Sequence, residues 1–176
     1  MTQADPLFDK IIQQHAKTWH FLWLVDKKDP KKNLPRQGKI SLLSKEEASA
    51  AIENLRANLA AKGEASDLFG REKKAGEMAG ILASVEQTFD GEELLPSLEE
   101  KAANLFYRLV KNHPFVDGNK RIGTLLFLLF LEKNKISYPG ELSQVALQIA
   151  RSAPAWREEI ISGLVSFLRA FGESSK

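Results

Sequence analysis

The sequence contains no cysteine and only three histidines, which limits the metal and redox chemistry open to it. Without cysteine the chain can form neither disulfides nor thiolate metal sites, and three scattered histidines argue against a structural zinc site. The longest apolar run, residues 125–131, is far shorter than the roughly 20 residues of a membrane span. The N-terminus also lacks the basic-then-apolar pattern of a signal peptide. These absences favour the cytoplasm and give no indication of a membrane partner.

An excess of charge of one sign is missing as well. The formal net charge is +2, which does not by itself indicate nucleic acid as a partner. With 176 residues, of which 43% are hydrophobic, the chain is long enough to bury a core as one globular domain. We divide it into an N-terminal region (1–62), a flexible connection (63–80) and a core (81–176), and expect one compact domain.

Nine consecutive residues, 113–121, place an imidazole, a carboxylate, a glycine, an amide and two cations in one short loop. They read His-Pro-Phe-Val-Asp-Gly-Asn-Lys-Arg and lie between two apolar helical patterns. Because Pro114 disfavours helical conformation at His113, the preceding helix is predicted to end near Lys111 or Asn112. A histidine at a helix end, with an ordinary pKa of about 6.5, suits a general base for a hydroxyl.

The remaining loop residues are of types that bind a metal and phosphates. Asp117 offers the hard oxygen ligands that Mg²⁺ prefers, and Gly118 lets the backbone approach a ligand closely. Asn119 is predicted to cap the next helix, whose free N–H groups and dipole favour phosphate. Lys120 and Arg121 add positive charge, and Arg121 can bind phosphate oxygens through two hydrogen bonds. Each residue alone also fits a solvated turn, but together they favour transfer from a nucleoside triphosphate to a hydroxyl.

These nine residues resemble the signature of the Fic/Doc family. The resemblance implies an all-α helical bundle around a buried central helix, with a small β-hairpin flap beside the active loop. It also implies ATP and Mg²⁺ as cofactors. It assigns these roles: His113 as general base, Asp117 as metal ligand, Gly118, Asn119 and Lys120 in the phosphate cradle, Arg121 as catalytic and phosphate-binding residue, and Phe115 as anchor of the loop.

Two positions depart from family members that transfer a nucleotidyl group. Lys120 stands where those members usually have glycine, and Thr124 stands where they usually have a second arginine. Both departures resemble the Doc branch, whose members transfer the terminal phosphate of ATP to a protein hydroxyl, including one on a translation elongation factor. The leading expectation is therefore phosphotransfer to a target protein, as in a toxin. Protein adenylylation is the alternative, and a non-catalytic binding module is the third reading.

Many family members are inhibited by a helix with the pattern Ser or Thr, three residues, Glu, then Gly or Asn. This sequence has Thr88 and Glu92 at that spacing, but Glu93 follows. Since Thr124 also removes the arginine with which such a glutamate pairs, we expect inhibition by a separate, antitoxin-like protein, or by a lost or unrecognised domain, and not self-inhibition.

Elsewhere the patterns are mostly helical. Helices are predicted at 6–17, from the capping box Ser44–Glu47 to about Ala61, from the capping box Ser97–Glu100 to the loop, and at 141–152 and 155–171. A short strand is predicted at 19–25, a basic exposed loop at 26–38, and a hairpin around Asp90-Gly91. The basic loop fits either a solvated surface or a patch for an acidic partner. Trp156 and Phe167 are expected to be packing residues.

Overall fold

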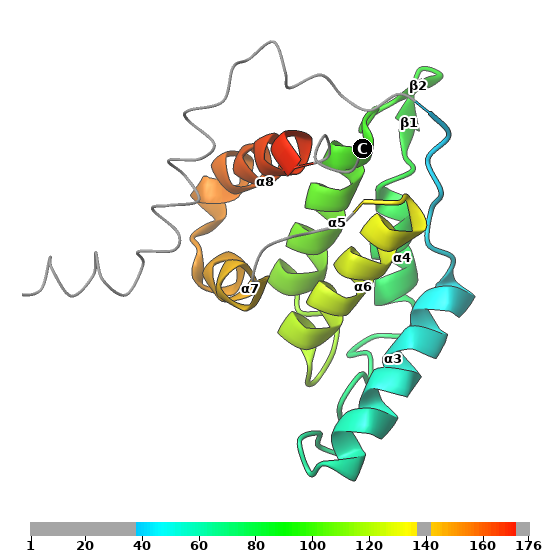
Figure 1. Ribbon diagram of the computed structural model, residues 1–176, viewed down its shortest axis with the longest axis vertical. Coiled ribbons are helices and arrows are strands. Elements are labelled where there is room, and N and C mark those ends of the chain that lie inside the picture. Colours follow the sequence, from blue (N-terminus) through cyan, green and yellow to red (C-terminus); the bar gives the residue numbers. More distant parts are fainter. Residues whose placement is uncertain (1–37, 137–141, 172–176) are drawn as a thin grey trace, which may run out of the picture.

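The computed structural model describes residues 38–136 and 142–171. The predicted helix at 6–17, the strand at 19–25 and nearly all of the basic loop at 26–38 lie outside these residues. Helices α5 (Leu98–Lys111) and α6 (Asn119–Lys133) lie side by side in the centre (Figure 1). Helix α3 (Lys45–Ala61) lies on one side of them, and α7 (Leu142–Arg151) and α8 (Arg157–Phe171) lie on the other. The predicted all-α fold is confirmed.

Both predicted capping boxes are present and set where two of the helices begin. The Ser44 hydroxyl accepts a hydrogen bond from the Glu47 N–H at 3.1 Å, and the Glu47 carboxylate accepts one from the Ser44 N–H at 2.8 Å. Ser97 and Glu100 form the same pair of bonds at the start of α5. Such caps satisfy N–H groups that the first helical turn leaves without acceptors. They fix where α5 begins and therefore where its other end places His113.

Helix α6 is the buried central helix that the apolar sequence predicted. Ile122, Leu126, Phe127 and Phe130 have no exposed surface, and the rings of Phe127 and Phe106 stack with centroids 4.6 Å apart. At Gly123, a Cβ would lie 2.8 Å from a methyl carbon of Val110 on α5. The lack of a side chain at this position lets the two helices approach closely, so their joined ends form a firm base for the loop between them.

The predicted hairpin is also present. Strands β1 (Thr88–Phe89) and β2 (Glu92–Glu93) pair antiparallel, and both turn residues have positive φ, 52° at Asp90 and 84° at Gly91. Positive φ at both central residues gives a turn that matches strand twist. The location differs from the expected flap beside the active loop. The hairpin precedes the first turn of α5, whereas the loop follows its last, and 14 helical residues span about 21 Å (Figure 1).

Residues 63–80, expected to be a flexible connection, carry ordered contacts to the rest of the fold. Phe69 within this stretch is 2% exposed. The Glu72 carboxylate accepts hydrogen bonds from the N–H groups of Gly76 at 3.1 Å and Met78 at 2.7 Å, at the start of α4 (Glu77–Ser84). A negative group at a helix N-terminus is favourable because free N–H groups and the helix dipole face it. The end of the stretch therefore forms the first turn of α4, which Glu72 stabilises.

The C-terminal part follows the predicted order, with one correction. A 3₁₀ turn at Pro154–Trp156 leads directly into α8, and Phe167 is buried as expected. The prediction that Trp156 packs in the core was wrong, since 60% of its surface is exposed. Pro154 and Trp156 share the short turn before α8, which carries the indole outside the bundle. No helix in the described ranges has both the length and the apolar character needed to cross a bilayer.

Candidate active site

His113 lies directly after the end of α5, as the sequence predicted. Helix α5 ends at Lys111 with Asn112 as its C-cap, and His113 has a positive φ of 50°. Positive φ is uncommon for residues other than glycine and marks a constrained position. Phe115, two residues later, is 1% exposed and holds the loop in the core as expected. The chain therefore reverses sharply at His113 and leaves its imidazole half-buried at the surface.

The loop is held by backbone pairing with residues 69–73, which we call the pairing segment. Isolated β-bridges join Phe69 to Asp117 and Glu72 to Phe115. Three backbone hydrogen bonds accompany them: Gly70 N–H to Asp117 O at 3.1 Å, Val116 N–H to Arg71 O at 2.8 Å, and Lys73 N–H to Pro114 O at 2.8 Å. Backbone bonds of this kind fix the chain independently of side-chain rotamers. The loop is thus ordered before any ligand binds.

Asn119 holds the loop from the other side, in a different way from that predicted. Its side-chain oxygen accepts a hydrogen bond from the Phe115 N–H at 2.9 Å, and its side-chain nitrogen donates to the Phe115 carbonyl at 2.8 Å. The predicted capping role was wrong because Gly118 is the N-cap of α6 and Asn119 is the first helical residue. From there its amide reaches back across the turn, and the helix N-terminus has no side-chain cap.

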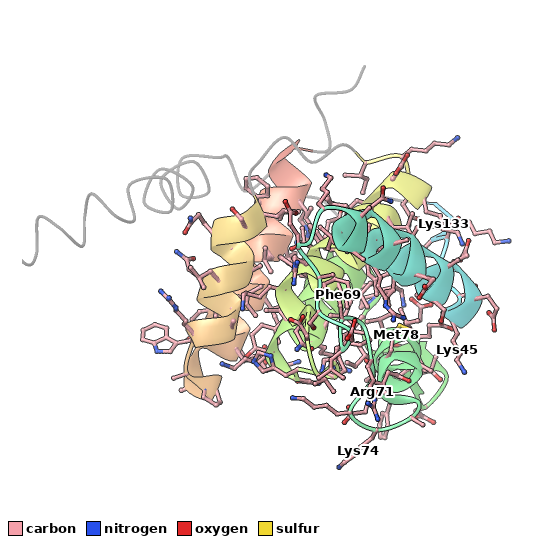
Figure 2. The ribbon with its side chains drawn as sticks, turned by 90° about the horizontal axis from the view of Figure 1, so that it is seen from below. Lys45, Phe69, Arg71, Lys74, Met78 and Lys133 are labelled. Carbon is pink, nitrogen blue, oxygen red and sulfur yellow. The ribbon has the colours of Figure 1, made fainter. Side chains whose placement is uncertain are left out.

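Gly118 has a conformation and a contact that exclude a side chain. Its φ is 90°, in the left-handed region that favours glycine. A Cβ at this position would lie 2.4 Å from the Phe69 ring of the pairing segment. The guanidinium of Arg121 stacks on the same ring, 4.6 Å from its centroid. Figure 2 shows Phe69 in the middle of the molecule, among the helices. The ring therefore sets how the cradle turns.

Asp117 is held as an ionised carboxylate. One carboxylate oxygen accepts a hydrogen bond from the Ser66 hydroxyl at 2.7 Å, and the other lies 3.7 Å from the Arg121 guanidinium. The Ser66 bond, together with the N–H of Gly118 and the charge of Arg121, lowers the pKa of Asp117 despite its partial burial. Within the described residues no group of three or more histidine, aspartate or glutamate side chains could hold a metal. Asp117 could contribute one ligand.

Arg121 is held by contacts with two other parts of the chain. Its Nη1 donates to the Glu64 carbonyl at 2.6 Å, and its Nη2 faces Asp117. A guanidinium has five N–H donors, so these contacts leave donors for phosphate oxygens. Its side chain is 43% exposed. The structure thus brings Asp117, Gly118, Asn119 and Arg121 together at the N-terminus of α6, with the exposed Lys120 between them.

Cations surround His113, and the sequence pattern identified only one of them. Burial lowers the pKa of His113, and the charges of Lys73, Lys120 and Lys111 lower it further. Lys111 is anchored through its ammonium group, which donates to the carbonyls of Ala150 and Ser152. Lys73 belongs to a charged run that looked like solvated surface, but its backbone pairs with Pro114 and its charge acts on His113. We call Lys73, Lys111 and Lys120 the lysine cluster.

The first prediction concerns the Phe69 contact of Gly118. Gly118→Ala should lower the free energy of unfolding by at least about 2 kcal/mol, since it adds backbone strain and an overlap with the ring. Gly76→Ala is a matched control, because Gly76 has a φ of 88° but nothing within 4 Å of its Cβ position. Denaturant unfolding measures both variants. Equal losses would show that Phe69 does not constrain the cradle.

The second prediction concerns the imidazole. His113 should titrate below the ordinary value of about 6.5 in an NMR pH titration, so that it is neutral at pH 7. Lys73→Ala should move its pKa upward, because a neighbouring positive charge that disfavours the imidazolium is removed. Lys74→Ala is the control, since Lys74 extends outward (Figure 2) and its charge does not act on His113. A His113 pKa unchanged by Lys73→Ala would contradict the assignment.

Comparison with known proteins agrees with this geometry. A family model for Fic/DOC proteins, which are typically transferases with nucleotide substrates, matches residues 43–131, just over half of the chain. The match runs from the start of α3 to nearly the end of α6 and includes the whole loop. The comparisons with curated proteins and with solved structures give no match. The chain therefore belongs to the Fic/DOC family.

Proposed function

We propose that this protein transfers the γ-phosphate of ATP to a hydroxyl group of a target protein. The observation that carries the proposal is the lysine cluster around a half-buried histidine, in the loop that leads to the N-terminus of α6. Lys120 acts on His113 together with Lys73 and Lys111. Three cations so close to a general base suit the terminal phosphate, which carries the most charge in the triphosphate and spreads it further in the transition state.

His113 would act as the general base. An acceptor hydroxyl loses its proton to an imidazole nitrogen while its oxygen attacks the γ-phosphorus. The bond from that phosphorus to the oxygen shared with the β-phosphate breaks, and ADP leaves. The imidazole has to be neutral to accept the proton, and both burial and the lysine cluster favour the neutral form.

The N-terminus of α6 would bind the triphosphate. The first turn of a helix has N–H groups without intrahelical acceptors, and the α6 N-terminus has no side-chain cap that would occupy them. Lys120 and Arg121 lie in this turn. Because the pairing segment and Asn119 already fix the loop, binding does not have to order it, which preserves binding energy for transition-state contacts.

The donor set fits Mg²⁺ only in company with the nucleotide. Mg²⁺ in such sites is usually held by one or two carboxylates plus substrate phosphates and water. Asp117 is one ionised carboxylate beside the cradle, and the described residues provide no cluster that would hold the metal alone. When bound with ATP, the metal neutralises phosphate charge. The fit is therefore to a metal that arrives with the triphosphate.

Regulation by a separate inhibitory protein is part of the proposal. The residues with the spacing of an inhibitory motif, Thr88 and Glu92, lie on β1 and β2 and not on a helix. They also lie at the opposite end of α5 from His113. The hairpin therefore offers no inhibitory helix over the cradle, which supports an antitoxin-like partner for a chain that acts as a toxin.

The third prediction identifies the transferred group. Cell lysate incubated with the protein, Mg²⁺ and ATP labelled at the γ-phosphate should yield a labelled protein, whereas ATP labelled at the α-phosphate should not. His113→Ala should reduce labelling by about 10²–10⁴-fold, the usual cost of removing a general base. Mass spectrometry of the modified residue then gives the added group.

Three results would contradict the proposal in different ways. Transfer of α-label with a mass increase of AMP would establish the adenylylation alternative. Lys120→Gly is informative here, since it should weaken γ-transfer by removing a cation from the cluster. If His113→Ala transfers the γ-label as fast as wild type, the histidine has no part in the mechanism. If the wild-type protein shows no Mg²⁺-dependent binding of ATP, the reading as a non-catalytic module is favoured.

A further inference from the structure

A groove of about 280 Å³ lies between α4 and α5, next to the active loop. One wall is a single face of α4, formed by Glu77, Gly80, Ile81 and Ser84 at helical spacing. The other wall is formed by the last turn of α5 and the loop, through Arg108, Asn112 and Pro114. The proposed reaction uses none of these seven side chains.

The groove extends to the two chain neighbours of His113. Asn112 and Pro114, which line it, are the residues directly before and after the histidine. The phosphate cradle lies further along the chain, at the N-terminus of α6, where Arg121 contacts Phe69 and Glu64. The groove and the cradle are therefore formed by different elements, α4 and α5 for the groove and α6 with residues 64–73 for the cradle.

Two polar groups in the groove lack partners within the described part of the chain. The Oε2 atom of Glu77 is buried and accepts no hydrogen bond. The guanidinium of Arg108, half-buried, forms no ion pair or hydrogen bond there. Burial and the charge of Arg157 lower the pKa of Arg108, although a guanidinium stays protonated. The unpaired, buried oxygen of Glu77 is unfavourable, and the half-buried guanidinium of Arg108 keeps donors available, so the two residues suit a ligand with both a donor and an acceptor.

We propose that this groove binds the segment of the acceptor protein next to the hydroxyl that is modified. A peptide group is neutral and offers an N–H to the Glu77 carboxylate and a C=O to the Arg108 guanidinium. The inference rests on the proposed phosphotransfer, which determines from where the acceptor hydroxyl approaches the phosphate. In phosphotransfer the attacking and leaving oxygens are roughly in line, so with ADP in the cradle the acceptor has to approach from elsewhere, and the groove is formed by other elements next to the same loop.

Size and charge favour a peptide over other occupants. The groove is slightly smaller than the roughly 300–1,000 Å³ of pockets that enclose drug-sized ligands. A short segment of an acceptor protein can bind in such a groove without being fully enclosed by it. Because one acidic and one basic residue line the two walls of the groove, a strongly charged ligand would be attracted by one and repelled by the other. A nucleoside is the competing occupant, and the experiment distinguishes it.

Gly80→Leu is the decisive variant. A Cβ added at Gly80 meets nothing within 4 Å, and replacing glycine inside a helix favours folding, so the side chain should fill the groove without disturbing α4. Gly163→Leu is the matched control, since Gly163 also lies inside a helix with nothing within 4 Å. Glu77→Gln is the second variant, because it replaces an acceptor by a donor with little change in shape.

The experiment measures binding of wild type and variants to an array of hydroxyl-containing peptides with randomised flanking residues, together with Mg²⁺-dependent ATP affinity. Gly80→Leu should weaken binding of the selected peptides by about tenfold or more, the effect of about 1.4 kcal/mol. Glu77→Gln should weaken it in the same direction. Both variants should keep the ATP affinity of wild type, and Gly163→Leu should match wild type throughout.

The remaining outcomes overturn the proposal or separate it from the proposed function. Equal peptide binding by wild type and Gly80→Leu, including no binding by either, overturns it. A loss of ATP affinity in Gly80→Leu also overturns it and assigns the groove to the nucleoside. Selective peptide binding without transfer of γ-label to those peptides leaves the groove assignment standing and contradicts phosphotransfer.

Discussion

The backbone pairing between residues 69–73 and residues 114–117 is the interaction on which the rest of the site depends. It brings Phe69 against Gly118 and Lys73 to where its charge acts on His113. It also fixes the backbone of Asp117, whose carboxylate accepts a hydrogen bond from Ser66. Asn119 closes the loop from the other side through both of its amide atoms. Without these contacts a loop of glycine and charged residues would lose its order to conformational entropy. With them, the donors of the cradle are in position before a ligand arrives.

The balance of charge around this loop indicates what it binds. Lys73 and Lys120 lie near His113 and form no ion pair within the described chain, and Asp117 carries negative charge at neutral pH. Such an excess of cations is unfavourable by itself, because like charges repel in a partly buried site. An anion that enters would relieve the repulsion, and a triphosphate with its metal supplies the charge. The same excess keeps the histidine neutral, so that binding and proton transfer share one cause.

The local features of the sequence predicted α3, α5 to α8 and the loop, but not α4, and the contacts between distant segments could not be predicted. Capping boxes and the Pro114 stop act over a few residues, and their outcome was confirmed for α3 and α5. The pairing of Lys73 with Pro114 joins residues 41 positions apart, and nothing in a run of charged residues reveals its partner. Asn119 fits a cap or a clamp equally well until the φ of Gly118 is known. The position of the hairpin depends on the length of α5 and not on the turn signal at Asp90-Gly91.

A structure with Mg²⁺ and an ATP analogue whose β–γ bridge cannot be cleaved would test the central claim most directly, since it shows which phosphorus atom lies beside His113. The account predicts that the γ-phosphorus is nearest to the imidazole, that the triphosphate contacts the N-terminus of α6, and that the groove between α4 and α5 stays free of the nucleoside. An α-phosphorus beside His113 with the nucleoside in that groove would contradict it.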